Sequence, residues 1–170
     1  MGIFKQDLSK RMKKEAISLG LCEKWQNEWT DNTSKDEMAE KFVKGIDFCI
    51  KHDWPSAKFI KKNFGNVIHK YGIYVDESFV TDSPTTILWG SCNGEIVAQR
   101  NETKTAYVKH NSRLKLFVRE NSMAFVSMYD NSELEITCDE TSKVFVYRYG
   151  GSIKYNDEEP VKIRERTKVK

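Results

Sequence analysis

The stretch from His110 to Ser152 reads HNSRLKLFVRENSMAFVSMYDNSELEITCDETSKVFVYRYGGS and places a serine at every tenth position. Between the serines the even-numbered positions are mostly apolar, as in Leu114, Leu116 and Val118, and this phase does not slip from one unit to the next. Alternation of apolar and polar residues over short runs is typical of β-strands with one buried face. The stretch therefore predicts a series of short strands joined by Asn-Ser and similar corners.

Two arrangements of such strands give different parities. In an antiparallel meander with a two-residue turn at Asn121-Ser122, Val118 would face Phe125, so the buried positions would change from even to odd at each turn. The buried positions stay even throughout, and a parallel coil keeps parity because each strand stacks on the strand one full turn below. The sequence therefore predicts a two-sheet parallel β-solenoid with 20-residue coils, three to four turns long from roughly Thr85 to Tyr155.

A 20-residue coil stacks each residue i on residue i+20, which sorts the outward side chains into two classes. On one sheet the outward pairs carry opposite charges: Arg113 over Glu133, Lys115 over Glu135, and Arg119 over Asp139. On the other sheet the pairs are aromatic: Phe125 over Phe145, Tyr129 over Tyr149, and Tyr107 over Ser127 over Tyr147. Cross-strand neighbours of either kind contribute roughly 0.2–1 kcal/mol each.

The aromatic sheet supplies the first candidate site, an interaction face with these members: Met123, Phe125, Tyr129, Phe145, Tyr147 and Tyr149. Exposed apolar patches usually mark an interface. Two readings stay open, because the face is either exposed for a partner or covered by N-terminal helices through Trp25 and Trp29.

The corners form columns of their own. Two inward serine columns are predicted to bond corner backbone groups, one of Ser112, Ser132 and Ser152, the other of Ser122 and Ser142. Asparagines stack outside them, Asn101 over Asn121 and Asn111 over Asn131.

Before the strands, the apolar spacing changes to three and four residues, which predicts helices. About four are expected, and the best of them runs from Lys35 to about His52 after a capping box of Ser34 and Glu37. Another follows Ser56 as AKFIKKNF. The predicted class is α+β, an N-terminal helical bundle followed by the solenoid, with a helical domain over 1–72, a β-solenoid domain over 73–157 and a charged tail over 158–170, the tail forming a short edge strand.

The helical phrases GLCEKWQNEW, FVKGIDFCIKHDWPSAKFIKKNF and KYGIYVDE, followed by the decapeptide pattern, resemble a family of small, uncharacterised proteins from bacterial genomes and their mobile elements or phages. The resemblance covers nearly the whole chain. It implies no named activity and carries over no catalytic residue, but it implies an accessory or phage-related role.

Composition excludes several classes. Of the 170 residues 39% are hydrophobic and 31% charged, which is typical of a globular protein, and a net charge of +3 does not by itself indicate nucleic acid or a membrane. No apolar run approaches the roughly 20 residues of a membrane span, and the first residues lack an apolar signal core, so a cytoplasmic protein is expected. The cysteines lie far apart, and we expect four reduced, mostly buried thiols.

No catalytic or metal-binding motif of known spacing occurs in the chain, so we expect no enzyme, no cofactor and no metal. Cys92 lies between glycines in GSCNGE and is predicted to be accessible, but no base accompanies it. A second candidate site follows Pro55, where a turn and a basic helix outline a helix-turn-helix with weak nucleic-acid contacts: Ser56, Lys58, Lys61, Lys62 and Asn63.

The sequence thus favours a non-enzymatic protein-interaction module on a rigid solenoid, with an unidentified protein partner or a second copy of the chain as a homo-oligomer. The alternative is a nucleic-acid- or nucleotide-binding accessory protein, anti-defence or regulatory, that uses the basic helix after Pro55. The two differ in salt dependence, since phosphate contacts weaken steeply as salt rises.

Overall fold

The computed structural model describes residues 2–167, with side chains from residue 7 onward. Contacts divide the chain into two compact units, Met1–Pro55 and Ser56–Lys170. The sequence placed its boundary after residue 72, but α5 (Ala57–Phe64) and the 3₁₀-helix η1 (Gly65–Tyr71) both contact the first strand and so belong with the solenoid.

The first unit contains α1 (Gly2–Ser18), α2 (Glu23–Glu28), α3 (Lys35–Lys44) and α4 (Ile46–His52). The predicted capping box is confirmed: the Glu37 N–H donates to Ser34 Oγ at 3.2 Å, and the Ser34 N–H donates to Glu37 Oε2 at 2.7 Å. Reciprocal bonds of this kind satisfy two of the free N–H groups at a helix start.

One continuous helix from Lys35 to His52 was expected, and this prediction is wrong. The backbone leaves helical geometry at Gly45, with φ −101° and ψ 26°, which separates α3 from α4. A Cβ at Gly45 would lie 3.1 Å from the Lys41 carbonyl and 3.4 Å from the Trp25 ring. The glycine therefore lets Trp25 pack against the break, and the described residues contain five α-helices where about four were predicted.

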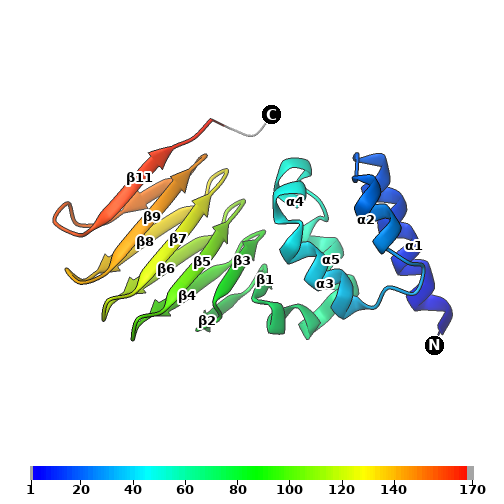
Figure 1. Ribbon diagram of the computed structural model, residues 1–170, viewed down its shortest axis with the longest axis horizontal. Coiled ribbons are helices and arrows are strands. Elements are labelled where there is room, and N and C mark those ends of the chain that lie inside the picture. Colours follow the sequence, from blue (N-terminus) through cyan, green and yellow to red (C-terminus); the bar gives the residue numbers. More distant parts are fainter. Residues whose placement is uncertain (1, 168–170) are drawn as a thin grey trace. The chain divides into compact units, whose positions relative to one another are not determined.

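The second unit continues from α5 and η1 into parallel strands (Figure 1). The strands are β1 (Ile73–Val75), β2 (Ser78–Thr81), β3 (Thr85–Trp89), β4 (Asn93–Ala98), β5 (Thr103–Val108), β6 (Arg113–Val118), β7 (Met123–Met128), β8 (Glu133–Cys138), β9 (Lys143–Arg148), β10 (Ser152–Lys154) and β11 (Val161–Glu165). Six strands pair in the order β1-β3-β5-β7-β9-β11, and five in the order β10-β8-β6-β4-β2.

The register confirms an α+β chain with a parallel β-solenoid of about four turns. Arg113 pairs with Glu133 and Met123 with Lys143, each 20 residues on. The coils shorten at both ends, since Ile73 pairs with Ile87 and Val161 with Val144. Parallel stacking keeps parity, which is why the even-numbered side chains stay inside.

The interior consists of stacked aliphatic side chains such as Val126 and Val146, which are essentially inaccessible to solvent. Each fully buried side chain of this size stabilises the fold by about 1.5–3 kcal/mol. Lys104 is also inward and buried; its ammonium donates to the Asp82 carbonyl and lies 3.4 Å from Glu102 Oε2. These partners satisfy a charge that would otherwise be costly to bury.

The predicted corner columns are confirmed for most of their length. The Ser122 N–H donates to Ser142 Oγ at 3.0 Å, and the Cys92 N–H donates to Ser112 Oγ at 3.2 Å. Outside them, Asn121 Nδ2 donates to Asn101 Oδ1 at 2.8 Å. The serine hydroxyls thus satisfy backbone groups that the turns remove from the strand ladders.

The prediction for Ser152 is wrong. Ser152 is exposed and pairs with Glu133, so this coil has 19 residues and its parity shifts by one. Gly151 makes the shortcut, because its φ is +86° and a Cβ there would lie 2.2 Å from the Ser132 carbonyl oxygen. Ser132 Oγ is consequently one of two buried side-chain polar atoms left without a hydrogen bond among the described residues.

The two ends of the solenoid are closed differently. At the first end η1 and α5 contact β1. At the other, β11 forms the edge of the six-stranded sheet and carries exposed Lys162, Arg164 and Arg166 in and just after it. Charged side chains on an edge oppose pairing with another chain, so the predicted charged edge strand is confirmed.

Candidate functional site

The outward face of the five-stranded sheet carries charged pairs. Arg113 Nε lies 3.2 Å from Glu133 Oε2, which confirms the first predicted pair, and Lys115 and Glu135 are register neighbours as predicted. These groups are well exposed, and such pairs contribute about 0–1 kcal/mol. This face is a solvated surface.

The third predicted pair, Arg119 with Asp139, is not made. Arg119 Nη2 donates instead to Gln99 Oε1 at 2.8 Å, one coil earlier. The Asp139 carboxylate accepts the Glu120 N–H at 2.8 Å, and this bond is the largest cause of the lowered pKa of Asp139. The corner backbone N–H therefore takes the acceptor that the guanidinium was expected to use.

The six-stranded sheet carries the predicted aromatic ladders. The rings of Phe125 and Phe145 stack with centroids 5.2 Å apart and planes at 11°, and those of Tyr129 and Tyr149 with centroids 4.8 Å apart and planes at 13°. Within this ladder Tyr129 is buried, whereas Met123 is 38% exposed. Phe125, Phe145, Tyr147 and Tyr149 are half-buried. The structure thus brings together all six predicted residues and leaves most of them accessible.

Basic residues extend this face beyond what the sequence indicated. In β11, Lys162 pairs with Phe145 and Arg164 pairs with Tyr147, so both continue the aromatic columns. The guanidinium of Arg166 lies 5.5 Å from the centre of the Tyr147 ring. The 17-residue spacing of the last coil hid this alignment, because a 20-residue register would have matched Phe145 with Glu165.

The outward positions of β5, β7 and β9 contain no Asp or Glu, and Phe145 and Tyr147 of β9 pair with Lys162 and Arg164 of β11. The exposed Glu165 of β11 pairs with Arg148. We call the half-exposed part of this surface the aromatic-basic face; it comprises Met123, Phe125, Lys143, Phe145, Tyr147, Tyr149, Lys162, Arg164 and Arg166. It ends toward β3, where Trp89 is fully buried and the Lys109 ammonium lies over its ring and 2.9 Å from Asp130 Oδ2.

Two residues of the second predicted site already use their side chains in hydrogen bonds to the backbone of their own helix. Ser56 Oγ accepts the Phe59 N–H at 3.2 Å, and Asn63 Nδ2 donates to the Phe59 carbonyl at 2.8 Å. These two side chains stabilise α5 itself. Lys58, Lys61 and Lys62 are exposed, as on any solvated helix face.

The cysteines are free thiols, with Cys22 exposed and the other three buried, as predicted for most of them. The expectation that Cys92 is accessible is wrong: it is 2% exposed, and Sγ donates to the Tyr74 carbonyl at 3.2 Å. Burial raises the pKa of Cys92, and raises that of Cys49 to about 12. A thiol in this state is a poor nucleophile.

A His–Glu pair was not anticipated. His69 Nε2 lies 2.8 Å from Glu77 Oε1, which also accepts the Val75 N–H, and Tyr74 stacks on the imidazole. Sequence spacing gives no signal for it, because η1 and the turn after β1 bring the two together. The pair fastens η1 to the first coil, and no group of three His, Cys, Asp or Glu suited to a metal ion occurs within residues 2–167.

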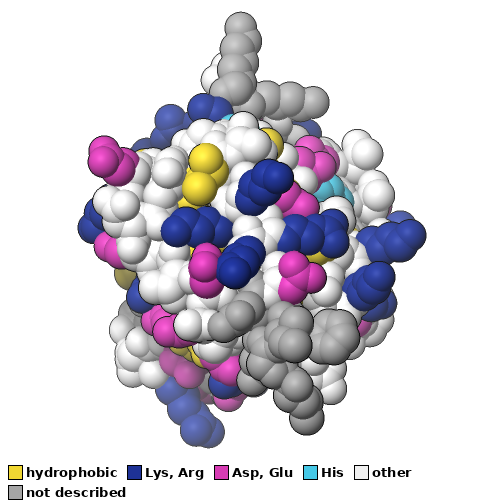
Figure 2. Space-filling view, turned by 90° about the vertical axis from the view of Figure 1, so that its right-hand side faces the viewer, with side chains coloured by type: hydrophobic (Ala, Val, Ile, Leu, Met, Phe, Trp, Pro, Cys, Tyr) yellow, Lys and Arg dark blue, Asp and Glu magenta, His cyan; other side chains and the backbone are white. Residues whose placement is uncertain are grey.

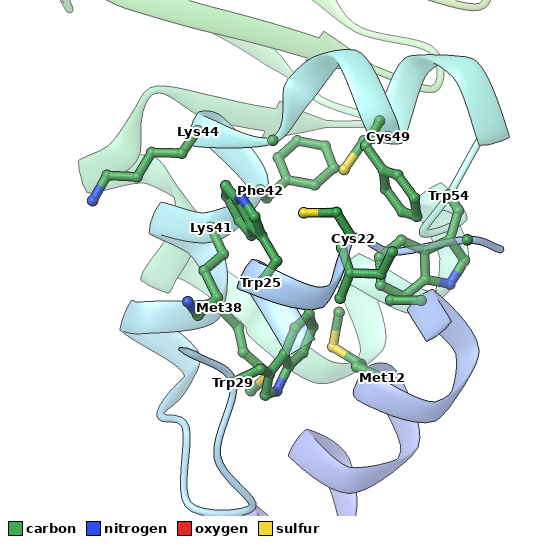
Figure 3. A pocket seen from close by; sticks show the side chains of 15 residues that line it. Met12, Cys22, Trp25, Trp29, Met38, Lys41, Phe42, Lys44, Cys49 and Trp54 are labelled. Carbon is green, nitrogen blue, oxygen red and sulfur yellow. The ribbon is translucent and has the colours of Figure 1, made fainter. Parts of the chain in front are cut away.

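The helical unit contains a cavity of about 280 Å³, which Figure 3 shows from close by. Its walls come from α1 to α4 and from Trp54, and three tryptophans contribute to them: Trp25, Trp29 and Trp54. On the side of α1 and α2, Figure 2 shows Lys and Arg intermixed with Asp and Glu and few hydrophobic side chains. The apolar groups of this unit thus gather around the cavity, a feature that the sequence did not reveal.

None of the helices in the described part of the chain has the length and apolarity to cross a membrane. Comparison with protein-family models, with curated proteins and with solved structures found no match for this chain.

Proposed function

We propose that the protein is a non-enzymatic protein-interaction module, and that the aromatic-basic face of the six-stranded sheet is its binding surface. The observation that carries the proposal is the pairing of apolar and basic columns, in which Phe145 continues into Lys162 and Tyr147 into Arg164. The exposed Glu165 at the end of β11 lies 3.2 Å from Arg148 Nη1, which offsets its charge. Aromatic and arginine side chains are enriched at protein interfaces. The complementary partner presents apolar side chains flanked by Asp or Glu.

The size of the face favours a modest contact. The three strands that carry the face, β7, β9 and β11, lie about 4.8 Å apart and are five or six residues long, which gives a surface of roughly 10 by 20 Å. That is roughly 200 Å² in projection, well below the approximately 800 Å² per partner of a standard interface. We therefore propose a transient complex with one acidic, amphipathic element of a partner protein, or with a second copy of the chain that offers such an element.

The ring geometry argues against nucleic acid on this surface. Unpaired bases bind by stacking on exposed ring faces. The Phe125 and Phe145 rings already stack on each other, as do those of Tyr129 and Tyr149, so they turn mainly their edges outward. Edges suit side-chain packing, whereas base stacking needs the faces.

Two observations support a role without catalysis. Cys92 is buried with a raised pKa, and in the His69–Glu77 pair the carboxylate accepts the Val75 N–H and the imidazole stacks on Tyr74, which are structural contacts. Catalysis by acyl transfer needs a nucleophile and a base within hydrogen-bond reach. The accessory, mobile-element role implied by the helical phrases fits a binding protein and remains part of the proposal.

Site-specific photo-crosslinking tests the proposal. A photoreactive phenylalanine replaces Phe125 in one variant and Lys115, on the opposite sheet, in the matched control, and both are irradiated in cells. The proposal predicts protein adducts, to a partner or to a second copy, through position 125 only. Adding Arg164→Glu to the position-125 variant should reduce those adducts at least threefold.

Three outcomes contradict the proposal. They are equal labelling through positions 115 and 125, adducts at position 125 that nuclease removes, and no adducts at position 125 at all. Folding of both variants is checked beforehand by their circular dichroism, which should match the unaltered chain.

A further inference from the structure

The cavity of the helical unit has walls made of rings, methylene groups and sulfur atoms. Figure 3 shows the rings of Trp25, Phe42 and Trp54 bordering the central space, with the Cys22 sulfur turned into it. Met12 and Met38 add thioethers, and the remaining lining includes Ala16, Leu21, Phe48, Cys49 and two lysines, Lys41 and Lys44. Such a lining attracts apolar atoms and offers little to polar ones.

Two of the three indole N–H groups along these walls already have partners. Trp29 Nε1 donates to Ser9 Oγ at 2.9 Å, and Trp54 Nε1 donates to Glu15 Oε2 at 3.1 Å. The Cys49 thiol is neutral near pH 7, because burial raises its pKa to about 12. A ligand therefore need not supply a hydrogen bond, and a charged ligand would lose its hydration without compensation.

The two lysines at the rim do not change this conclusion. Figure 3 shows the ammonium ends of Lys41 and Lys44 directed away from the central space. Lys44 Nζ lies 2.9 Å from Glu40 Oε1, and Lys41 Nζ lies 5.3 Å from the centre of the Trp25 ring. Glu37 and Glu28 border the neighbouring groove, so the rim has no excess positive charge for an anion.

Volume and shape define the ligand further. A dry apolar cavity of about 150 Å³ accommodates one benzene ring. A cavity of about 280 Å³ therefore has room for roughly two fused rings. Planar rings stack on Trp and Phe faces, and flexible Met side chains adjust to the remaining space.

We propose that this cavity is a binding site for a small neutral aromatic molecule of about two fused rings. The site is independent of the aromatic-basic face, since its walls lie entirely within residues 12–54. It gives the helical unit a ligand-binding role beside the interaction role of the solenoid.

The four tryptophans provide the test and its internal control. Naphthalene is titrated into ¹⁵N-labelled protein while the indole N–H resonances are followed. Those of Trp25, Trp29 and Trp54 should shift and saturate, whereas that of Trp89, buried in the solenoid, should stay in place. Absence of any shift up to the solubility limit, or an equal shift of Trp89, would overturn the proposal.

Charge and volume are tested separately. 2-Naphthoate, with the same rings and one negative charge, should bind at least tenfold more weakly than naphthalene, and equal or tighter binding would contradict a neutral ligand. Cys22→Phe should fill the cavity and weaken naphthalene binding at least tenfold, because the Cys22 side chain faces the central space (Figure 3). The variant should still fold, since Cys22 is exposed and makes no capping bond with its side chain.

Cys22→Ser is the matched control and should bind within twofold of the unaltered chain. If Cys22→Phe does not fold, Cys22→Leu fills part of the space and should still weaken binding at least threefold. Unchanged binding in the filling variant that folds would place naphthalene outside the cavity and refute the site.

Discussion

The two sheets of the solenoid have the same inward chemistry and different outward chemistry. Val126 and Ile136, on the six- and five-stranded sheets respectively, point into one common core. Outward, the first sheet stacks Phe125 on Phe145, whereas the second pairs Arg113 with Glu133. The even-numbered, inward side chains therefore determine the coil, whereas the odd-numbered, outward side chains can differ between the sheets and give each surface its own chemistry.

Charges placed in the core should have the largest effect and should not distinguish the sheets. Val126→Asp and Ile136→Asp each bury an unpaired carboxylate, which costs several kcal/mol. Both should unfold the solenoid, as seen by loss of the β signal in circular dichroism and of the cooperative melt. If either variant were folded and soluble, the result would contradict a core shared by the two sheets.

Truncation of outward phenylalanines should distinguish the sheets. Phe145 and Phe117 are both half-buried, but Phe145 stacks on Phe125 whereas Phe117 pairs with Val97 and Thr137. Phe145→Ala should lower the free energy of unfolding by about 0.5–1.5 kcal/mol more than Phe117→Ala, the contribution of an aromatic pair. Equal losses in urea titrations would mean that the stack adds no stability.

Charge reversal on the five-stranded sheet should have a smaller effect. Glu133→Lys places a cation beside Arg113 and should cost less than about 1 kcal/mol, since both groups are exposed. The double variant Arg113→Glu with Glu133→Lys should recover most of that loss in the same titrations. Failure to recover would show that the two side chains do not interact.

The corner at Asp139 should give the smallest effect, visible only in acid. Hydrogen bonds, chiefly from the Glu120 N–H, hold the pKa of Asp139 below its usual 3.8. The folded state therefore gains stability above pH 3.8, and this gain is lost as the pH falls through the lower folded pKa. Asp139→Asn should flatten the decline of the melting temperature below pH 4, and an unaltered decline would argue against the bond.

The sequence predicted the solenoid at the level of single pairs because a repeated register leaves few alternatives. Phe125 over Phe145 and Arg113 over Glu133 follow from parity and period alone. The prediction failed where Gly151 and the short last coil break the period. Ser152 was assigned to an inward column, and Lys162 and Arg164 were not recognised as neighbours of the aromatic columns. Arg119 illustrates a third limit, since a corner N–H competes with a side chain for the same acceptor.

The helical unit was harder to predict because no repeat constrains it. Local signals located the capping box of Ser34 and Glu37, which depends on neighbours in sequence. The break at Gly45 and the cavity depend on how Trp25 and Trp54 pack against distant residues, which spacing does not encode. The burial of Cys92 could not be predicted for the same reason, since it depends on contacts with the distant residues Tyr74 and Ser112.

The register of the strands underlies every surface described, and methyl-to-methyl nuclear Overhauser effects measure it most directly. The parallel coil predicts strong cross-peaks between residues 20 apart, Leu114 with Leu134 and Val126 with Val146. Cross-peaks from the Val118 methyl groups to the ring protons of Phe125, as neighbouring segments in antiparallel order would give, together with the absence of the 20-residue pairs, would contradict it.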